Sequence, residues 1–304
     1  MSTPDWQSLF PCESRAIDLD GLRYAYVDEG QGPTLLAVHG NPTWSFYWRN
    51  LIRGLSPHYR VLAVDHMGCG RSSKPQAYNY RLQQHVDNLS RFVEQLDLRD
   101  VTLLAHDWGG AIGLGAALAA PERFVRFVMF NTAAFRSRSM PWRIRACRIP
   151  CLGKLAVQGG NAFARAALVM AVADRRRMTP AVRAGLLAPY DSWQHRRAIQ
   201  AFVEDIPMAP SHPSYNALVR IEQGLASLAD RPWAFIWGMR DWCFTPAFLE
   251  QFLTMIPQAE VHRLADAGHY VVEDAHEQIV PIVERFLAEH PLPVAAGRSS
   301  VHAP

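Results

Sequence analysis

Short apolar runs that alternate with amphipathic stretches constrain the fold of this chain more than any other feature. Seven runs are predicted as strands, and most are nearly continuous in Val, Leu and Ala. They lie at 22–27, 34–38, 61–64, 101–105, 124–130, 233–237 and 261–264. Helices are expected at 44–55, 81–96, 108–120 and about 277–289. Strands buried on both faces are typical of a parallel sheet covered by helices, so the pattern predicts an α/β fold.

This rhythm breaks between residues 136 and 229. The segment has helical patterns, no convincing buried strand, and seven prolines that divide it into short pieces. It carries thirteen Arg and one Lys against five acidic residues, whereas the whole chain has a net charge of only +3. We therefore expect a basic helical insertion at 136–229 between two strands of one sheet. The core would be formed by 1–135 and 230–304, with a frayed tail at 291–304.

Composition excludes several other classes of protein. A chain of 304 residues with 49% hydrophobic and 19% charged residues can bury a sizeable core. A net charge of +3 is too small to indicate nucleic-acid binding. The N-terminal residues contain no apolar signal segment, and the longest apolar run, 111–120, is too short to span a bilayer. Five scattered cysteines form no disulfide framework or zinc site, so we expect a cytoplasmic protein without metal or cofactor.

One strand-to-helix junction carries the residue that points most directly to chemistry. In residues 105–110, AHDWGG, the small Ala105 and Gly109 lie on either side of Asp107. A nucleophile elbow needs such neighbours because its turn is tight and strained. The helix that follows directs its N-terminus at the elbow, which favours a negative charge there. Asp107 occupies the position where Ser is usual, and a simple helix N-cap is the alternative interpretation.

Two further segments fit the same kind of site. Residues 39–42 (HGNP) follow a strand, where an α/β-hydrolase has its oxyanion loop. Residues 267–270 (AGHY) follow the last strand, where that fold has its catalytic histidine. The order nucleophile, acid, base along the chain therefore matches an α/β-hydrolase. His106 precedes Asp107 in the strand, so its side chain should point to the opposite face of the sheet. We expect it to be a buried structural residue.

These motifs make the chain similar to the haloalkane dehalogenase branch of the α/β-hydrolase superfamily. The resemblance extends over residues 20–290 and rests on HGNPTWSFYWR, DHMGCGRSSKP, HDWGG and DAGHY. It implies an eight-stranded, mostly parallel sheet flanked by helices, with a helical cap inserted after strand six. By position, that cap is the basic segment 136–229.

The resemblance also implies the role of each site residue. Asp107 would be the nucleophile that forms an alkyl-enzyme ester, and His269 would be the base. Asn41 and the indole of Trp108 would stabilise the leaving group, and their backbone N–H groups would form an oxyanion hole. One dehalogenase subfamily has its acid after strand six, where this chain has no carboxylate. Another has it after strand seven, so we expect Asp241 to orient His269.

Three enzymatic interpretations share this machinery. A haloalkane dehalogenase would use Asn41 and Trp108 to hold a halide. An epoxide hydrolase would need two tyrosines in the cap, and the cap contains two, Tyr190 and Tyr215. The third interpretation depends on the sequence of the cap. A receptor or assembly subunit on an inactive hydrolase scaffold is a non-enzymatic alternative, against which the intact catalytic set argues.

The cap favours a carbon–carbon lyase. Residues 131–157, 160–173 and 186–215 resemble the β-lactone decarboxylases of bacterial long-chain olefin biosynthesis, which are relatives of the dehalogenases. The resemblance implies conversion of a hydrophobic cis-3,4-dialkyl-oxetan-2-one into a cis-olefin and carbon dioxide. It also implies a thiolase-like condensing enzyme, a ketone reductase and a β-lactone synthetase as partners. The three arginines at 175–177, after the apolar stretch 166–173, are compatible with either a solvated face or a membrane surface.

Overall fold

The structure is a computed structural model that describes residues 5–292, and all seven expected strands are present in it. They are β2 (Leu22–Glu29), β3 (Thr34–Val38), β4 (Arg60–Val64), β5 (Val101–Asp107), β6 (Phe124–Thr132), β7 (Trp233–Gly238) and β8 (Glu260–Leu264). The sequence pattern does not predict the eighth strand, β1 (Arg15–Leu19), because most of its residues are exposed and it has no apolar run. The expected frayed tail lies, from residue 293 on, outside the described residues.

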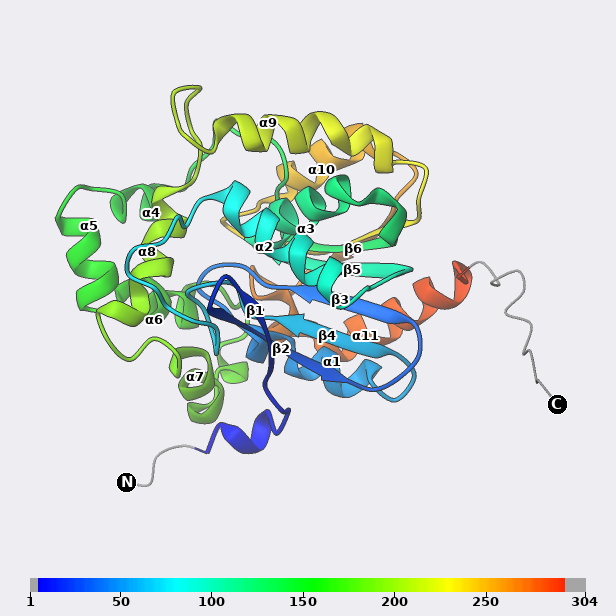
Figure 1. Ribbon diagram of the computed structural model, residues 1–304, viewed down its shortest axis with the longest axis horizontal. Coiled ribbons are helices and arrows are strands. Elements are labelled where there is room, and N and C mark those ends of the chain that lie inside the picture. Colours follow the sequence, from blue (N-terminus) through cyan, green and yellow to red (C-terminus); the bar gives the residue numbers. More distant parts are fainter. Residues whose placement is uncertain (1–4, 293–304) are drawn as a thin grey trace.

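The strands form one sheet in the order β1-β2-β4-β3-β5-β6-β7-β8 (Figure 1). Strands β3 to β8 are parallel, while β2 runs antiparallel to both β1 and β4. The expected eight-stranded, mostly parallel sheet is therefore confirmed. Every residue of β5 is buried, because β5 lies between β3 and β6 and is covered on both faces. The carboxyl ends of such central strands are where open α/β sheets bind ligands.

Helices cover both faces of the sheet and create two apolar cores (Figure 1). One core contains α1 (Arg49–Leu55) and α11 (Val271–Glu289), and the other contains α2 (Leu82–Gln95), α3 (Trp108–Ala119) and α10 (Pro246–Met255). Short 3-10 turns occur at η1 (Gln7–Leu9), η2 (Ser45–Trp48) and η3 (Pro121–Arg123). The last helix begins six residues earlier than expected and bends at Ala275. The sequence pattern does not predict this first part of α11, because Glu273 and Asp274 are buried there instead of facing solvent.

Only helices connect β6 to β7, and the structure describes all of that connection. They are α4 (Trp142–Ala146), α5 (Leu152–Lys154), η4 (Leu155–Gly159), α6 (Ala162–Met170), η5 (Arg175–Arg177), α7 (Pro180–Leu187), η6 (Gln194–Arg196), α8 (Arg197–Glu204), α9 (Tyr215–Gly224) and η7 (Leu225–Leu228). In Figure 1, α4 to α8 form a lobe beside the sheet, and α9 returns along the side of α3. Among residues 5–292, no helix is both long enough and apolar enough to cross a membrane.

A buried carboxylate ties this lobe to the core. Asp205 follows α8 and accepts hydrogen bonds from Arg81 Nη1 at 2.9 Å, from the Leu82 N–H at 2.8 Å and from Ser214 Oγ. Because Leu82 is the first residue of α2, its N–H has no partner inside the helix. The carboxylate of Asp205 satisfies that donor and lies at the positive end of the α2 dipole.

Further buried hydrogen bonds hold the lobe over the carboxyl end of the sheet. Asp274 accepts the N–H of Ala173 at 2.8 Å and that of Gly268 at 2.7 Å, so it joins the end of α6 to the loop before α11. The indole of Trp44 donates to the carbonyl of Gly185 in α7 at 2.9 Å. These contacts come from separate parts of the lobe, and they therefore fix its position relative to the sheet.

Replacing the buried carboxylate should weaken the fold. We expect Asp205→Ala to lower the free energy of unfolding by about 2–4 kcal/mol, because it leaves buried donors without a charged acceptor. Urea unfolding followed by circular dichroism measures this loss. Asp191→Ala is the matched control, since Asp191 is exposed and pairs with His195 at the surface. We expect that control to cost less than about 0.5 kcal/mol, and equal losses in the two variants would contradict the assignment.

Four histidines are fully buried near the carboxyl ends of the strands: His39, His66, His85 and His106. Burial lowers the pKa of His39 to about 3 and holds the pKa values of the other three well below the usual 6.5. His39 Nε2 accepts the N–H of His66 at 3.0 Å, which requires an unprotonated nitrogen. All four side chains are therefore neutral in the folded protein at neutral pH.

Stability should consequently fall as the pH drops below about 6.5, because unfolded histidines bind protons that the buried ones cannot. Each such histidine contributes a loss of about 1.4 kcal/mol per pH unit. His85 packs on Phe202 with ring centroids 4.5 Å apart, and neither of its ring nitrogens has a partner among the described residues. We expect urea unfolding of His85→Phe to lose about 1.4 kcal/mol less than the wild type between about pH 7.5 and 5.5. An unchanged pH dependence in His85→Phe would refute the explanation.

Candidate active site

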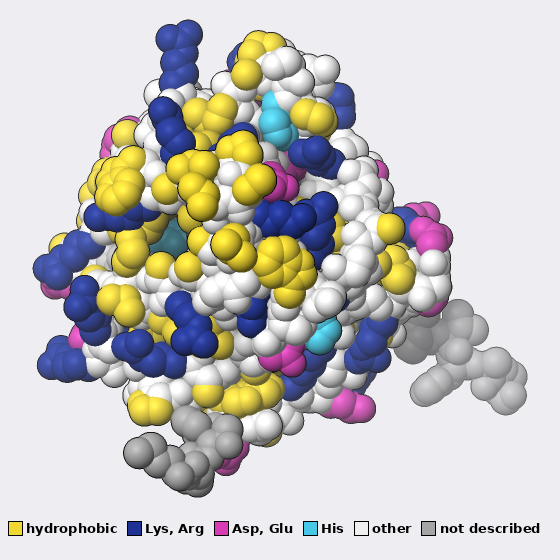
Figure 2. Space-filling view, turned by 90° about the vertical axis from the view of Figure 1, so that its left-hand side faces the viewer, with side chains coloured by type: hydrophobic (Ala, Val, Ile, Leu, Met, Phe, Trp, Pro, Cys, Tyr) yellow, Lys and Arg dark blue, Asp and Glu magenta, His cyan; other side chains and the backbone are white. Residues whose placement is uncertain are grey.

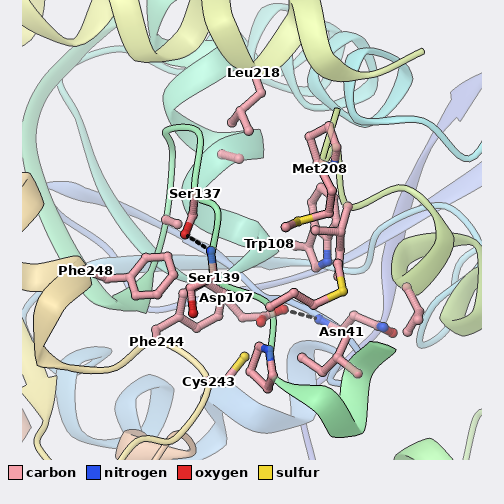
Figure 3. Close-up of a pocket in the computed structure, with 18 of the residues that line it drawn as sticks. Asn41, Asp107, Trp108, Ser137, Ser139, Met208, Leu218, Cys243, Phe244 and Phe248 are labelled. Carbon is pink, nitrogen blue, oxygen red and sulfur yellow. Dashed lines mark hydrogen bonds between the residues drawn. The ribbon is translucent and has the colours of Figure 1, made fainter. Parts of the chain in front are cut away.

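Asp107 lies in a strained turn between β5 and α3. Its φ of 54° and ψ of −127° fall in a region that L residues rarely adopt, at a cost of about 1–3 kcal/mol. The turn is tight: a Cβ on Gly109 would lie 2.0 Å from the carbonyl oxygen of Val38. The residue is only 7% exposed, and its carboxylate faces the cavity drawn in Figure 3. The expected elbow geometry is therefore present at this residue.

The loop after β3 holds one oxygen of this carboxylate. The backbone N–H of Asn41 donates to Asp107 Oδ1 at 2.7 Å, and a Cβ on Gly40 would lie 2.1 Å from the same oxygen. Burial raises the pKa of Asp107, while the charge of His269 and the N–H groups of Asn41 and Trp108 act in the opposite direction. Asp107 is thus a desolvated carboxylate held by backbone donors.

His269 lies between two carboxylates. Its Nδ1 donates to Asp241 Oδ2 at 2.9 Å, and its Nε2 lies 3.6 Å from Asp107 Oδ2. Burial alone would lower the pKa of His269, but the charge and hydrogen bond of Asp241 and the charge of Asp107 outweigh it, so the pKa is raised. The structure thus brings together Asp107, His269 and Asp241, which are far apart in the sequence.

Two groups that the sequence does not single out position Asp241. Asn131 donates from Nδ2 to Asp241 Oδ2 at 3.0 Å and accepts the N–H of Gly238 at 2.7 Å. The N–H of Cys243 donates to the other oxygen, Oδ1, at 2.6 Å. In the sequence, Asn131 belongs to the segment after strand six that is noted only for its lack of a carboxylate. No local signal reveals its role, because its partners are more than 100 positions away in the chain.

His106 is buried as expected, and it also supports the site. Its Nε2 donates to the carbonyl oxygen of His269 at 2.9 Å, and the two rings lie 4.6 Å apart. The strand does direct the His106 side chain away from Asp107. It nevertheless packs against the loop that carries His269, so it helps to fix the position of that backbone.

Asn41 and Trp108 both lie next to the carboxylate and line the same cavity (Figure 3). The indole of Trp108 packs on Phe202 of α8, with ring centroids 5.4 Å apart, and lines the cavity. The side-chain amide of Asn41 donates to the carbonyl of Ile199 at 3.2 Å, while its oxygen has no partner among the described residues. One N–H of that amide therefore contacts α8 of the lobe, and the other is not used by this bond.

A largely apolar cavity of about 900 Å³, its open mouth included, begins at Asp107. Its polar lining residues are few, and they are Asn41, Asp107, Trp108, Ser137, Ser139 and Cys243. Its apolar lining comes from both the core and the lobe: Leu82, Ala111, Ala133, Phe135, Met140, Pro141, Ile144, Phe163, Val203, Ile206, Pro207, Met208, Leu218, Phe244 and Phe248. Within residues 5–292, no cluster of His, Cys, Asp and Glu could hold a metal ion. Such a site suits a hydrophobic molecule whose reacting polar group reaches Asp107.

The two tyrosines of segment 136–229, Tyr190 and Tyr215, do not line this cavity. Tyr190 is 1% exposed, and its hydroxyl donates to the carbonyl of Thr43 at 3.0 Å. Tyr215 begins α9, outside the set of lining residues. The epoxide hydrolase interpretation therefore loses its proton donors, because a count of tyrosines says nothing of where their hydroxyls lie.

The fold and its strained elbow define the class of this protein, and comparison with known proteins agrees. A model of the α/β hydrolase fold family matches residues 33–275. The crystal structure of the haloalkane dehalogenase DatA from Agrobacterium tumefaciens C58 superposes with a TM-score of 0.83 at 27% identity, over 92% of this chain and 97% of that one. The chain belongs to the α/β hydrolase family.

Two relatives show to which family within the α/β hydrolases the chain belongs. The protein named cis-3-alkyl-4-alkyloxetan-2-one decarboxylase in Xanthomonas campestris pv. campestris is 42% identical, over 90% of this chain and 94% of its own length. The protein of the same name in Shewanella oneidensis is 37% identical, over 93% and 90%. Within the α/β hydrolases, the chain is thus a member of the family that contains these two proteins.

The pair of His269 and Asp241 can be tested directly. We expect Asp241→Asn to lower the pKa of His269, because the substitution removes the larger of the two charges that raise it. An NMR titration of the histidine side chains measures this shift, with His269→Gln identifying the signal. Asp266→Asn is the matched control, since Asp266 is exposed and pairs with Arg240. A shift of the same size in both variants would show that the effect is not local.

Proposed function

We propose that this protein is a β-lactone decarboxylase that converts a cis-3-alkyl-4-alkyloxetan-2-one into a cis-olefin and carbon dioxide. The observation that carries the proposal is the position of Asp107, a buried carboxylate at the inner end of an almost wholly apolar cavity. A dialkyl β-lactone has one compact polar ring and two apolar chains, which matches that distribution of polarity. The two relatives named for this reaction support the choice of substrate.

Asp107 is the proposed nucleophile, and burial makes its carboxylate more basic. The proposed attack is on ring carbon 4, where a new C–O bond to Asp107 forms as the bond from that carbon to the ring oxygen breaks. The ring oxygen then carries the electron pair as part of a free carboxylate. The indole N–H of Trp108 and the side-chain N–H of Asn41 are the proposed donors to this anion.

The second step releases both products. The bond between carbon 3 and the new carboxylate breaks and gives carbon dioxide, and its electron pair forms the double bond to carbon 4. The bond from carbon 4 to Asp107 breaks at the same time, which regenerates the aspartate. No water, proton or redox partner is consumed. Attack inverts carbon 4, and elimination with the two leaving groups on opposite sides then gives the cis-olefin from the cis-lactone.

In this proposal His269 stabilises negative charge, and Asp241 orients His269. The raised pKa of His269 favours its protonated form. The positive charge stabilises the carboxylate of Asp107 and the carboxylate that forms when the lactone ring opens. Asp241 orients the imidazole through Nδ1, and Asn131 holds Asp241 in position. Asn131 is therefore a proposed positioning residue and makes no contact with the substrate.

Haloalkane dehalogenase activity is the second candidate. It is favoured by the donors at Asn41 and Trp108 beside the carboxylate and by the likeness to DatA. In that reaction a halide leaves, and His269 activates a water that hydrolyses the alkyl ester of Asp107. The two reactions therefore differ in whether water enters the product.

The finer assignments form part of the same proposal. Residues 136–229 act as a cap that selects the substrate, on a core formed by 1–135 and 230–304. The five cysteines are free, which suits a reducing cytoplasm. The strained lactone must be supplied by an enzyme that closes a β-hydroxy acid. A β-lactone synthetase, together with a thiolase-like condensing enzyme and a reductase, is the proposed set of partners.

A product assay tests this function. The purified protein is offered a cis-dialkyl β-lactone, a bromoalkane and an epoxide, and olefin, bromide and diol are measured. We expect olefin from the lactone and a loss of at least about 10³-fold in Asp107→Asn, which removes the nucleophile but keeps the shape of the side chain. In ¹⁸O-labelled water, the carbon dioxide first released should not carry the label, because both of its oxygens come from the lactone ring.

Asp266→Asn serves as the control, because it changes an exposed carboxylate that does not line the cavity. Rapid bromide release without olefin would favour the dehalogenase instead. Olefin formation that persists in Asp107→Asn would disprove nucleophilic attack by Asp107.

A further inference from the structure

The lobe has an exposed apolar surface on α4, α5 and η4. Trp142 is 71% exposed, Leu152 67%, Leu155 61% and Ile149 48%. We call these four residues, with Arg143, Arg145 and Lys154, the mouth surface. Figure 2 shows hydrophobic side chains gathered around a hollow in this side of the molecule, with Lys and Arg at their border. Exposed apolar side chains that gather in one place, and not singly, mark a site of interaction.

The charge around these side chains has one sign. Residues 136–173 contain seven basic residues and no acidic one. Arg143, Arg145 and Lys154 are exposed, and no carboxylate among residues 5–292 lies within 4.0 Å of them. The guanidinium of Arg143 lies over the ring of Trp142, 5.1 Å from its centroid. The mouth surface is thus a belt of indole and aliphatic groups bordered by cations without counterions.

The three arginines at 175–177, unlike the cations of the mouth surface, include residues that form ion pairs. Arg176 pairs with Asp174, and Arg177 pairs with Glu277. These ion pairs neutralise much of the charge on η5, so the expected membrane candidate at 175–177 is weaker than the mouth surface. Sequence counting could not reveal this, because Glu277 is 100 positions from its partner.

The mouth surface is continuous with the entrance of the cavity. Met140 and Met208 line the cavity and also a shallower hollow next to it. The remaining lining of that hollow is Arg145, Arg148 and Ile149, two of which belong to the mouth surface. A hydrophobic molecule that enters the cavity here must therefore pass between the exposed apolar residues and their cationic border.

We propose that the mouth surface docks this protein on an anionic lipid bilayer, with the entrance of the cavity facing the membrane. Trp142 and the three aliphatic side chains lie at the interface, where indoles and aliphatic groups are favoured. The arginines and Lys154 contact the anionic headgroups. A second copy of this chain fits poorly, because Arg143, Arg145 and Lys154, which have no counterion among the described residues, would repel the same surface on another copy.

Vesicle binding tests this docking without any need for turnover, so its outcome is separate from that of the proposed reaction. The protein is sedimented with phosphatidylcholine vesicles that either contain or lack phosphatidylglycerol. We expect binding to the anionic vesicles only, and less of it at high salt. The double variant Arg143→Glu/Arg145→Glu should bind at least about tenfold more weakly. Leu152→Ser/Leu155→Ser should also bind more weakly, with an unchanged thermal unfolding temperature.

The matched control is Arg285→Glu, which reverses an exposed charge on α11, away from the mouth surface. We expect it to leave binding unchanged. Brominated lipids provide a second readout, because they should quench tryptophan fluorescence of the wild type more than that of Trp142→Ala. Absence of binding to anionic vesicles would overturn the proposal, as would equal loss in Arg285→Glu. Self-association that Leu152→Ser/Leu155→Ser abolishes, without vesicle binding, would assign the surface to a second copy.

Discussion

The hydrogen bond from the backbone of Asn41 to the carboxylate of Asp107 is the contact on which the rest of the site depends. It can form only because β3 and β5 are neighbours in the sheet, with Val38 opposite Ala105, so that the residues after the two strands meet. The strained turn at Asp107 then directs the carboxylate toward that donor. The small Gly40 and Gly109 leave room for the close approach. Because the carboxylate is buried, these backbone donors replace the water that an exposed aspartate would bind.

Few polar groups surround the carboxylate of Asp107. Neutral buried histidines and an apolar cavity lie close to it, and charge is concentrated on Asp107, His269 and Asp241. The Asp205 and Asp274 contacts hold the lobe in place and so maintain the cavity between lobe and sheet. A reaction that consumes no water suits such a site, since a dry environment strengthens the electrostatic effect of each donor. The proposed docking of the mouth surface fits the same site, because the proposed dialkyl substrate is more soluble in a membrane than in water.

Much of this architecture follows from local patterns. Seven strands and the elbow at Asp107 are visible in the sequence because buried strands and a strained turn both restrict residue type. Strand β1 is not visible, because an edge strand with exposed charged residues has no hydrophobic signature. The first turns of α11 are missed because Glu273 and Asp274 face inward, where Glu273 pairs with Arg49. Asn131 is missed for a related reason: its amide acts through Gly238 and Asp241, and that contact exists only once β6 and β7 pair.

The sequence by itself determined which residue types stand at the ends of the strands, and therefore Asp107, His269 and Asp241 as one candidate set. It did so because an elbow and a Gly-His turn each leave a short local signature, while the assignment of Asp241 rests on the resemblance to the dehalogenases. Only the tertiary structure decided which polar groups face the cavity. Tyr190 is turned to a backbone carbonyl, Arg177 is paired with Glu277, and Arg145 has no counterion among the described residues. These outcomes depend on distances between segments far apart in the chain, and packing sets those distances rather than any local pattern.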